Sequence, residues 1–261
     1  MAGRRQRRNP QSRRAARPRV ARSSGRRERR LKRLALINML VVAGVVAGGF
    51  FLMAILSPKP YDQDSLCAIS DELPAHTAII IDKTDEYSAQ QANLIASAIR
   101  RAQDRLAIGE RFTLFELDAD GRFDPRGAFS LCNPGRGSQV NPLFSNPERI
   151  EERYANMFEA PFEAVISDLV EPKEAPSSPI LEAMARLAQT EFFSPEAPDR
   201  TLILISDMLQ NSDLFSAYGG GGTVMPDTTP PARTVADEVI ARFGDNLRGT
   251  RLTIRLIARE R

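Results

Sequence analysis

Short β-branched runs alternate with amphipathic stretches over residues 74–261. Runs such as TAIII and RTLILI are short and continuously apolar, which is typical of strands buried on both faces of a sheet. A further run, RFTLFEL, alternates apolar and polar residues and precedes a turn-rich segment, which indicates a hairpin. Five strands are predicted, at Thr77–Ile81, Arg111–Leu117, Ala128–Leu131, Arg200–Ile205 and Thr250–Ile257.

Four segments between these strands repeat apolar residues at helical spacing. In the first, Leu94 and its neighbours at three- and four-residue intervals are predicted to face the core. Pro161 is expected to bend or divide the second, because proline removes one backbone donor. Ser178 is suited to cap the third, with Pro179 in the favoured first helical position. The predicted helices are Ser88–Leu106, Glu148–Val170, Ile180–Phe193 and Thr234–Leu247.

The alternation of strands and helices predicts the α/β class. The expected architecture is an open, doubly wound, mostly parallel sheet of the Rossmann-like type, with helices on both faces. The strand at Ala128–Leu131 is expected to pair antiparallel at one edge of this sheet. The folded unit is predicted to cover residues 74–261, after a connector at residues 57–73.

A 23-residue uncharged stretch, Leu34–Leu56, is long enough to cross a bilayer as one helix. Basic residues crowd its N-terminal flank, so the positive-inside rule predicts a cytoplasmic N-terminus and a periplasmic or extracellular body. The protein is therefore expected in the cytoplasmic (inner) membrane as a single-pass protein. A cleaved signal peptide is the alternative, but the apolar stretch is long for one and no clear cleavage site follows it.

Charge is distributed unevenly along the chain. Residues 1–33 hold fifteen of the 36 Lys and Arg and one of the 33 Asp and Glu, which leaves a net charge of −11 on the rest. With few large apolar side chains, this tail is predicted to be disordered. It is suited to anionic lipid headgroups. Nucleic acid is a weaker expectation, because no aromatic residues interleave the arginines.

Following the chain direction through the predicted sheet places several side chains at its two ends. Asp82, Thr84, Ser178 and Asp207 fall at the carboxyl ends of the parallel strands, where open α/β sheets hold their sites. Both cysteines, Cys67 and Cys132, fall at the opposite end. A disulfide between them is predicted, which would persist outside the cytoplasm; two unrelated buried thiols are the alternative.

Three loops resemble the metal-ion-dependent adhesion site of the von Willebrand factor type A (VWA) family. The family pattern D-x-S-x-S is similar to Asp82-Lys83-Thr84-Asp85-Glu86, with Thr84 in place of the first Ser. APSSPILEAM is similar to G-G-T-P-L-x-x-A-L and aligns Ser178 with the family Thr. LILISDMLQNS is similar to an apolar strand followed by S-D-G-x-x-N and aligns Asp207 with the family Asp. The resemblance covers residues 74–258.

The resemblance implies a divalent cation, Mg²⁺ in the first instance, held by Asp82, Thr84, Glu86, Ser178 and Asp207. Glu86 departs from the pattern, because the family has a second Ser there; Asp85 is an alternative ligand. In the family one coordination position stays open for a carboxylate of a protein partner. The extra acids in this loop are expected to strengthen metal binding at the expense of partner capture, or to favour calcium. The alternative is a metal-free site whose acids cap loops and helices.

The function expected from these features is a membrane-tethered VWA-like binding module, and not an enzyme, that docks an acidic side chain of a protein partner in a cell-envelope assembly. A metal-dependent hydrolase or phosphotransfer enzyme that uses Asp82 as nucleophile or metal ligand is one alternative, although the single histidine, His76, is expected at the far end of its strand. The other alternative is a metal-free structural adaptor whose basic tail binds lipid or nucleic acid.

Overall fold

The computed structural model describes residues 24–56, 60–83, 87–117, 119–122, 129–143, 145–169, 175–218 and 229–258. The chain divides into two compact units, residues 1–56 and 57–261. In the first unit, helix α1 runs over Ser24–Leu56. The helix is long and apolar enough to span a membrane, and its apolar side chains are exposed. Residues 24–33, predicted as part of a disordered tail, therefore belong to this helix, and residues 1–23 lie outside the described residues.

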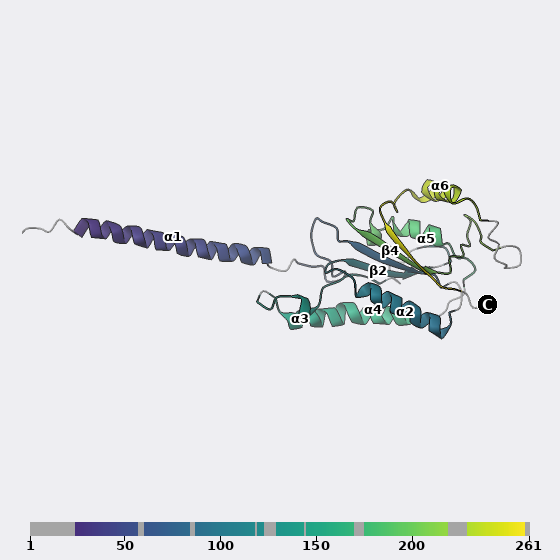
Figure 1. Ribbon diagram of the computed structural model, residues 1–261, viewed down its shortest axis with the longest axis horizontal. Coiled ribbons are helices and arrows are strands. Elements are labelled where there is room, and N and C mark those ends of the chain that lie inside the picture. Colours follow the sequence, from purple (N-terminus) through teal and green to yellow (C-terminus); the bar gives the residue numbers. More distant parts are fainter. Residues whose placement is uncertain are drawn as a thin grey trace, which may run out of the picture. The chain divides into compact units, whose positions relative to one another are not determined.

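The second unit is built on a sheet of five strands in the order β3-β2-β1-β4-β5 (Figure 1). All pairs are parallel except β2 with β3, so the predicted α/β class with one antiparallel edge strand is confirmed. The strands are β1 (His76–Ile81), β2 (Arg111–Glu116), β3 (Phe129–Cys132), β4 (Arg200–Ser206) and β5 (Arg251–Leu256).

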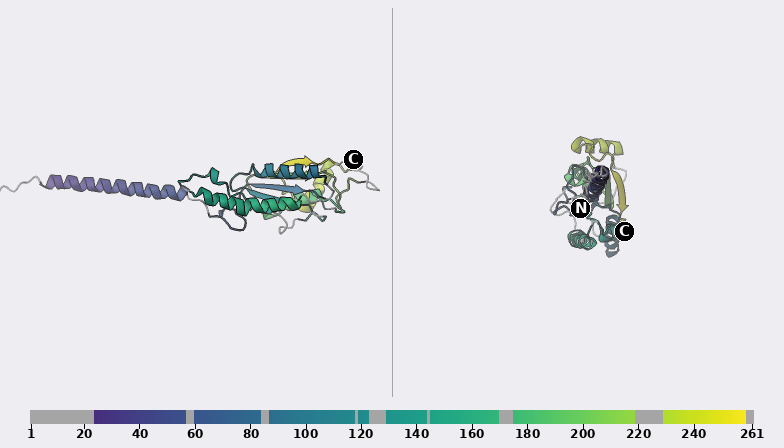
Figure 2. Two further views of the ribbon diagram at one scale, coloured as in Figure 1. Left: turned by 90° about the horizontal axis from the view of Figure 1, so that it is seen from below. Right: turned by 90° about the vertical axis from the view of Figure 1, so that its left-hand side faces the viewer.

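Helices cover both faces of this sheet (Figures 1 and 2). Helices α2 (Ala89–Gln103) and α4 (Ala160–Leu169) lie on one face, and α5 (Ile180–Leu187) and α6 (Ala232–Phe243) on the other. Because β1 lies in the middle of the sheet, all six of its residues are buried. Its side chains alternate between two cores, one on each face. Ile79 and Ile81 pack with α2 and α4, whereas Ala78 and Ile80 pack with α5.

The predicted second helix forms without a break at Pro161. Helix α3 (Pro147–Arg153) passes into a π-helical turn, η2 (Tyr154–Glu159), and then into α4. In this turn the backbone N–H of Ala160 bonds to Ala155, five residues earlier. The wider turn just before Pro161 accommodates the ring and the missing N–H, so the helix changes type there and continues.

Two predictions of buried side chains, for the first helix and for the strand RTLILI, are wrong in part. Leu94 of α2 is 61% exposed, and Thr201 and Ile203 of β4 are only half-buried. These side chains lie on the α2 face of the sheet near its β5 edge. The structure shows hollows there between α2 and the strands β4 and β5.

Residues 60–73, predicted as a connector outside the fold, are packed against the end of the sheet that carries the amino ends of the parallel strands. Leu66 is buried and belongs to the core shared with α2 and α4. Cys67 is joined to Cys132 of β3 by a disulfide, with 4.8 Å between their Cα atoms. The backbone of Cys132 also donates to the carbonyl of Ser65, at 2.8 Å.

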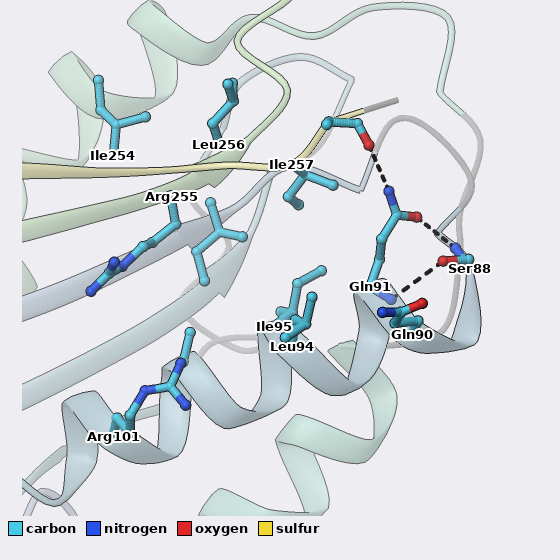
Figure 3. Close-up of a pocket in the computed structure, with 13 residues that line it drawn as sticks. Ser88, Gln90, Gln91, Leu94, Ile95, Arg101, Ile254, Arg255, Leu256 and Ile257 are labelled. Carbon is cyan, nitrogen blue, oxygen red and sulfur yellow. Dashed lines mark hydrogen bonds between the residues drawn. The ribbon is translucent and has the colours of Figure 1, made fainter. Parts of the chain in front are cut away.

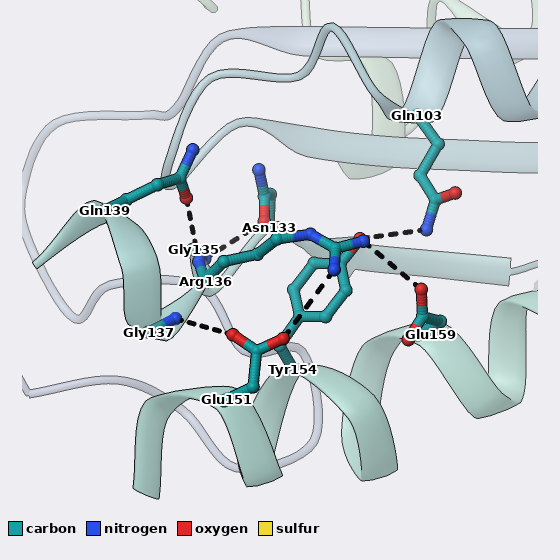
Figure 4. A network of polar contacts seen from close by, with 9 residues as sticks. All are labelled: Gln103, Asn133, Gly135, Arg136, Gly137, Gln139, Glu151, Tyr154 and Glu159. Carbon is teal, nitrogen blue, oxygen red and sulfur yellow. Dashed lines mark hydrogen bonds and ion pairs between the residues drawn. The ribbon is translucent and has the colours of Figure 1, made fainter. Parts of the chain in front are cut away.

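A cation–π network closes the loop after β3 at the same end (Figure 4). The Arg136 guanidinium lies 4.1 Å from the centre of the Tyr154 ring and pairs with the carboxylates of Glu151 and Glu159. Glu151 also accepts from the backbone N–H of Gly137, at 2.7 Å. One arginine thus joins the short 3-10 helix η1 (Gly137–Gln139) to α3 and to η2.

Candidate functional site

The carboxylate of Asp82 is the centre of the site at the carboxyl ends of β1 and β4. Asp82 is 4% exposed, and its backbone N–H continues the ladder by donating to Ile205 of β4. One carboxylate oxygen, Oδ2, accepts hydrogen bonds from the hydroxyls of Ser178, at 2.9 Å, and Ser206, at 2.8 Å. Both serines are themselves buried. Three segments far apart in sequence therefore bring oxygen atoms to one point.

Ser178 is held in place by the loop that follows β4. Its backbone N–H and carbonyl exchange hydrogen bonds with the carbonyl and N–H of Asn211, both at 2.9 Å. The Asn211 side chain adds a bond to the carbonyl of Pro176, at 3.0 Å. This short two-stranded contact orients the Ser178 hydroxyl toward Asp82.

The expectation that Ser178 caps α5 is wrong. The hydroxyl of Ser178 is used by Asp82, and the helix begins at Ile180 after Pro179. The side-chain carbonyl of Gln210 accepts from the backbone N–H of Leu181 instead, at 3.1 Å. The amide nitrogen of Gln210 donates to Glu182, at 2.7 Å. A buried glutamine from the neighbouring loop thus satisfies one of the free N–H groups at the start of this helix.

Asp207 follows Ser206 directly and lies at the same end of the sheet. It is half-buried, and its Oδ1 accepts from the backbone N–H of Leu209 at 2.9 Å. Between them, Met208 has a positive φ of 65°, a conformation that costs a non-glycine residue about 1–2 kcal/mol. The Ser206 hydroxyl stabilises this turn, because it accepts from the Met208 N–H at 2.8 Å.

Lys83, the residue after Asp82, is buried and bonded on two sides. Its ammonium group pairs with Glu116 at the end of β2, at 3.2 Å, and donates to the carbonyl of Asp168 in the last turn of α4, at 3.1 Å. A cation at a helix C-terminus is favoured by the helix dipole. Lys83 therefore connects the start of the loop after β1 to β2 and α4.

The structure brings together some of the predicted site residues. Asp82 and Ser178 are in contact, and Asp207 is one residue from the third member, Ser206. Thr84, Asp85 and Glu86 lie outside the described residues. Ser206, Gln210 and Lys83 were not predicted as site residues; Ser206 was recognisable as the polar residue that ends a buried strand. The lone histidine, His76, begins β1 at its other end, about 20 Å away for six residues of extended chain.

The donor set determines which ligands this site suits. Among the described residues, no group of three His, Cys, Asp or Glu side chains is placed to hold a metal ion. A cation at Asp82 would therefore depend on serine hydroxyls together with carboxylates. Oxygen-only donors of this kind suit Mg²⁺ or Ca²⁺ and do not suit softer transition metals.

No known family model matches this chain, and no curated protein matches it either.

Proposed function

We propose that this protein is a membrane-tethered binding module whose divalent-cation site docks an acidic side chain of a protein partner. The observation that carries the proposal is the convergence of Ser178 and Ser206 on one oxygen of Asp82. Hydroxyl oxygens retain lone pairs when they donate, so the same three groups supply a compact set of hard oxygen donors.

The proposed tether is helix α1, which is long and apolar enough to cross a bilayer. The proposed topology has the basic N-terminal flank in the cytoplasm and the second unit outside, according to the positive-inside rule. The Cys67–Cys132 disulfide supports this side for the second unit, because disulfides persist in oxidising compartments. An inner-membrane, cell-envelope location is part of the proposal.

The resemblance to the VWA adhesion site gains support from the loop after β4. The family pattern S-D-G-x-x-N corresponds to Ser206, Asp207, Met208 and Asn211, and Met208 has the positive φ for which glycine is the ordinary choice. Asn211 holds Ser178, the residue aligned with the family Thr. In the proposed site Asp82, Ser178 and Asp207 hold the cation, with Thr84 and Glu86 completing the shell.

Neutral hydroxyl ligands explain why such a site would attract a partner. A cation held by few carboxylates keeps much of its positive charge, so an external carboxylate is drawn to a free coordination position. The bound cation supplies this electrostatic attraction. Asp82, Ser178 and Ser206 supply a buried floor, and the hydrogen bonds from the two serines to Asp82 orient the oxygens before any ligand arrives.

A hydrolase or phosphotransfer function has less support. The Ser178 hydroxyl donates directly to a carboxylate, and the only histidine of the chain is at the opposite end of β1. A serine nucleophile is ordinarily activated by a histidine or lysine base within hydrogen-bond reach. Lys83 is committed to Glu116 and to the end of α4.

The test is calorimetric titration of the full chain in detergent with Mg²⁺, Mn²⁺ and Ca²⁺ after treatment with a chelator. We expect one site, a rise in melting temperature with bound cation, and loss of both in Asp82→Asn and Ser178→Ala. Asp71→Asn removes an exposed acid in the segment before β1 and is the matched control. This variant should bind the cation with the same affinity as the wild-type protein.

Partner capture is tested in the same preparation. Membrane extracts passed over the immobilised chain should yield a protein retained with Mg²⁺ and released by chelator, and Ser178→Ala should retain none. Absence of cation binding in a folded protein would refute the metal-dependent function. If a partner is then retained equally with chelator and with Asp207→Ala, the metal-free adaptor is the correct alternative.

A further inference from the structure

The backbone of strand β5 forms one edge of the sheet. In the described part of the sheet, β5 pairs only with β4. The N–H of Ile257 donates toward β4, to Ser206, so in this parallel pair the backbone groups of Leu252, Ile254 and Leu256 point outward. A row of outward N–H and C=O groups is a template for another strand.

The side chains of the same three residues form an exposed apolar stripe. Leu252 is 46% exposed, Ile254 45% and Leu256 68%. Alternation along β5 places them on the sheet face that carries α5 and α6. Figure 3 shows Ile254 and Leu256 pointing to this side of the strand. An added strand would cover this stripe with its own apolar side chains.

The opposite face of β5 is basic. Two hollows of about 670 and 380 Å³ lie between α2 and the strands β4 and β5, and they share Ala98, Arg101 and Arg255. They therefore form one groove, which we name the α2–β5 groove. Arg255 points into it from β5 (Figure 3). Four arginines line the groove: Arg101, Arg105, Arg251 and Arg255.

These arginines have no acidic partners within the described part of the chain. None of the four takes part in an ion pair or a side-chain hydrogen bond there. The one acid in the groove, Glu110, is already bonded to the hydroxyl of Thr77, at 2.6 Å, and to the N–H of Ala107, at 2.8 Å. The four arginines and this one carboxylate therefore leave the groove lining with a net positive charge, in contrast to the acidic composition of residues 34–261.

We propose that the edge of β5 binds an extended segment of a protein partner in which acidic and apolar side chains alternate. The segment adds a strand to the sheet. Its backbone pairs with the outward groups of β5, its apolar side chains cover Leu252, Ile254 and Leu256, and its acidic side chains lie beside the arginines of the α2–β5 groove. Directly opposite side chains in such a pair are close enough for ion pairs.

Charge complementarity selects this occupant over two others. A second copy of β5 supplies no acidic side chain, and pairing about a two-fold axis at Thr253 would place Arg251 opposite Arg255, which is destabilising. Nucleic acid would leave the apolar stripe uncovered, and no aromatic side chain lines the groove for base stacking in the described residues. This inference does not depend on the proposed cation site, because the β5 edge uses none of its residues.

The test uses three fluorescent peptides and the full chain in detergent, with chelator present to exclude the cation site. Each peptide has about eight residues, enough to span the six residues of β5. One alternates Glu and Val, one has the same composition in two blocks, and one alternates Lys and Val. Binding is followed by anisotropy at about 50 mM and about 500 mM NaCl, which separates screened from unscreened attraction.

We expect the Glu–Val peptide to bind at least about tenfold more tightly than the other two, and more weakly at high salt. Ile254→Pro removes one outward N–H and no bond to β4, so it should weaken binding at least about tenfold. Ile254→Ala keeps that N–H and should cost less. The double variant Arg101→Glu/Arg255→Glu should lose the Glu–Val peptide and bind the Lys–Val peptide. Arg233→Glu, an exposed change on α6, should leave binding unchanged.

Equal binding of the alternating and block peptides would overturn the proposal, because it would show a response to charge alone. Unchanged binding by a folded Ile254→Pro would overturn it as well, as would an oligonucleotide that binds more tightly than the Glu–Val peptide. Should Ile254→Pro fail to fold, the comparison of the alternating with the block peptide decides whether the segment binds as a strand, and the reversal of peptide preference in the arginine double variant decides whether its acids lie beside the groove arginines.

Discussion

His76 is a buried histidine whose position makes the fold sensitive to acid. Its Nδ1 accepts from the backbone N–H of Ser194, at 3.1 Å, and its Nε2 has no partner among the described residues. Burial, followed by the nearby charges of Arg111 and Arg200, lowers the pKa of His76 from 6.5 to about 4. The folded state therefore holds this side chain neutral at physiological pH.

The pH dependence follows from that shift. Between pH 6.5 and pH 4 the unfolded chain binds a proton at this histidine and the folded chain does not, so stability is lost as pH falls through this range. The loss from this group is at most about 3 kcal/mol. Urea titrations followed by circular dichroism at several pH values should show it, and His76→Gln should flatten that part of the profile. An identical pH profile in the variant would contradict this account.

Some helices begin with contacts between residues close in sequence, and others begin with contacts to distant segments. Ser88 and Gln91 form a reciprocal capping box at the start of α2, a four-residue pattern visible in the sequence. The start of α5 is satisfied by Gln210, 29 residues away from Leu181. A local pattern can predict the first kind of boundary, whereas the second depends on the loop after β4 folding back on α5.

The packing of η1 on α3 depends on the absence of a side chain at Gly137. A Cβ at this position would lie 2.3 Å from the carbonyl oxygen of Pro147, which is backbone and cannot move without shifting α3. Gly137→Ala is expected to destabilise the second unit by about 1–3 kcal/mol. Thermal melting of the full chain measures the change. Ser138→Ala, an exposed change in the same turn, should have little effect; an equal loss in both variants would argue against the steric explanation.

At the scale of the whole molecule, one covalent link joins the segment before β1 to the edge strand β3. The Cys67–Cys132 disulfide closes a loop of 65 residues that contains β1, α2 and β2. In the chain-entropy account, a link of this length stabilises the fold by about 4 kcal/mol. The Cys67→Ala/Cys132→Ala variant should lose that amount in urea titrations, and reductant should have the same effect on the original protein. Stability that is indifferent to reductant would contradict the account.

Most of the elements and their order were predictable from the amino-acid sequence. Hydrophobic periodicity identified the strands and helices of the α/β sheet, and strand direction placed Asp82, Ser178 and Asp207 at one end and the cysteines at the other. These features are predictable because side-chain alternation and chain direction are local properties. The long apolar stretch was equally evident, since length and composition alone make a membrane-spanning candidate.

Which atoms meet depends on long-range packing. Ser178 was expected to cap a helix, yet its hydroxyl bonds Asp82, because Asn211 from a distant loop holds its backbone. Leu94 was expected in the core, yet it lines the α2–β5 groove, because no element of the described chain covers that part of the sheet. Periodicity shows which face of an element is apolar. Which neighbour covers that face, and which donor reaches a given oxygen, depends on long-range packing that no local pattern contains.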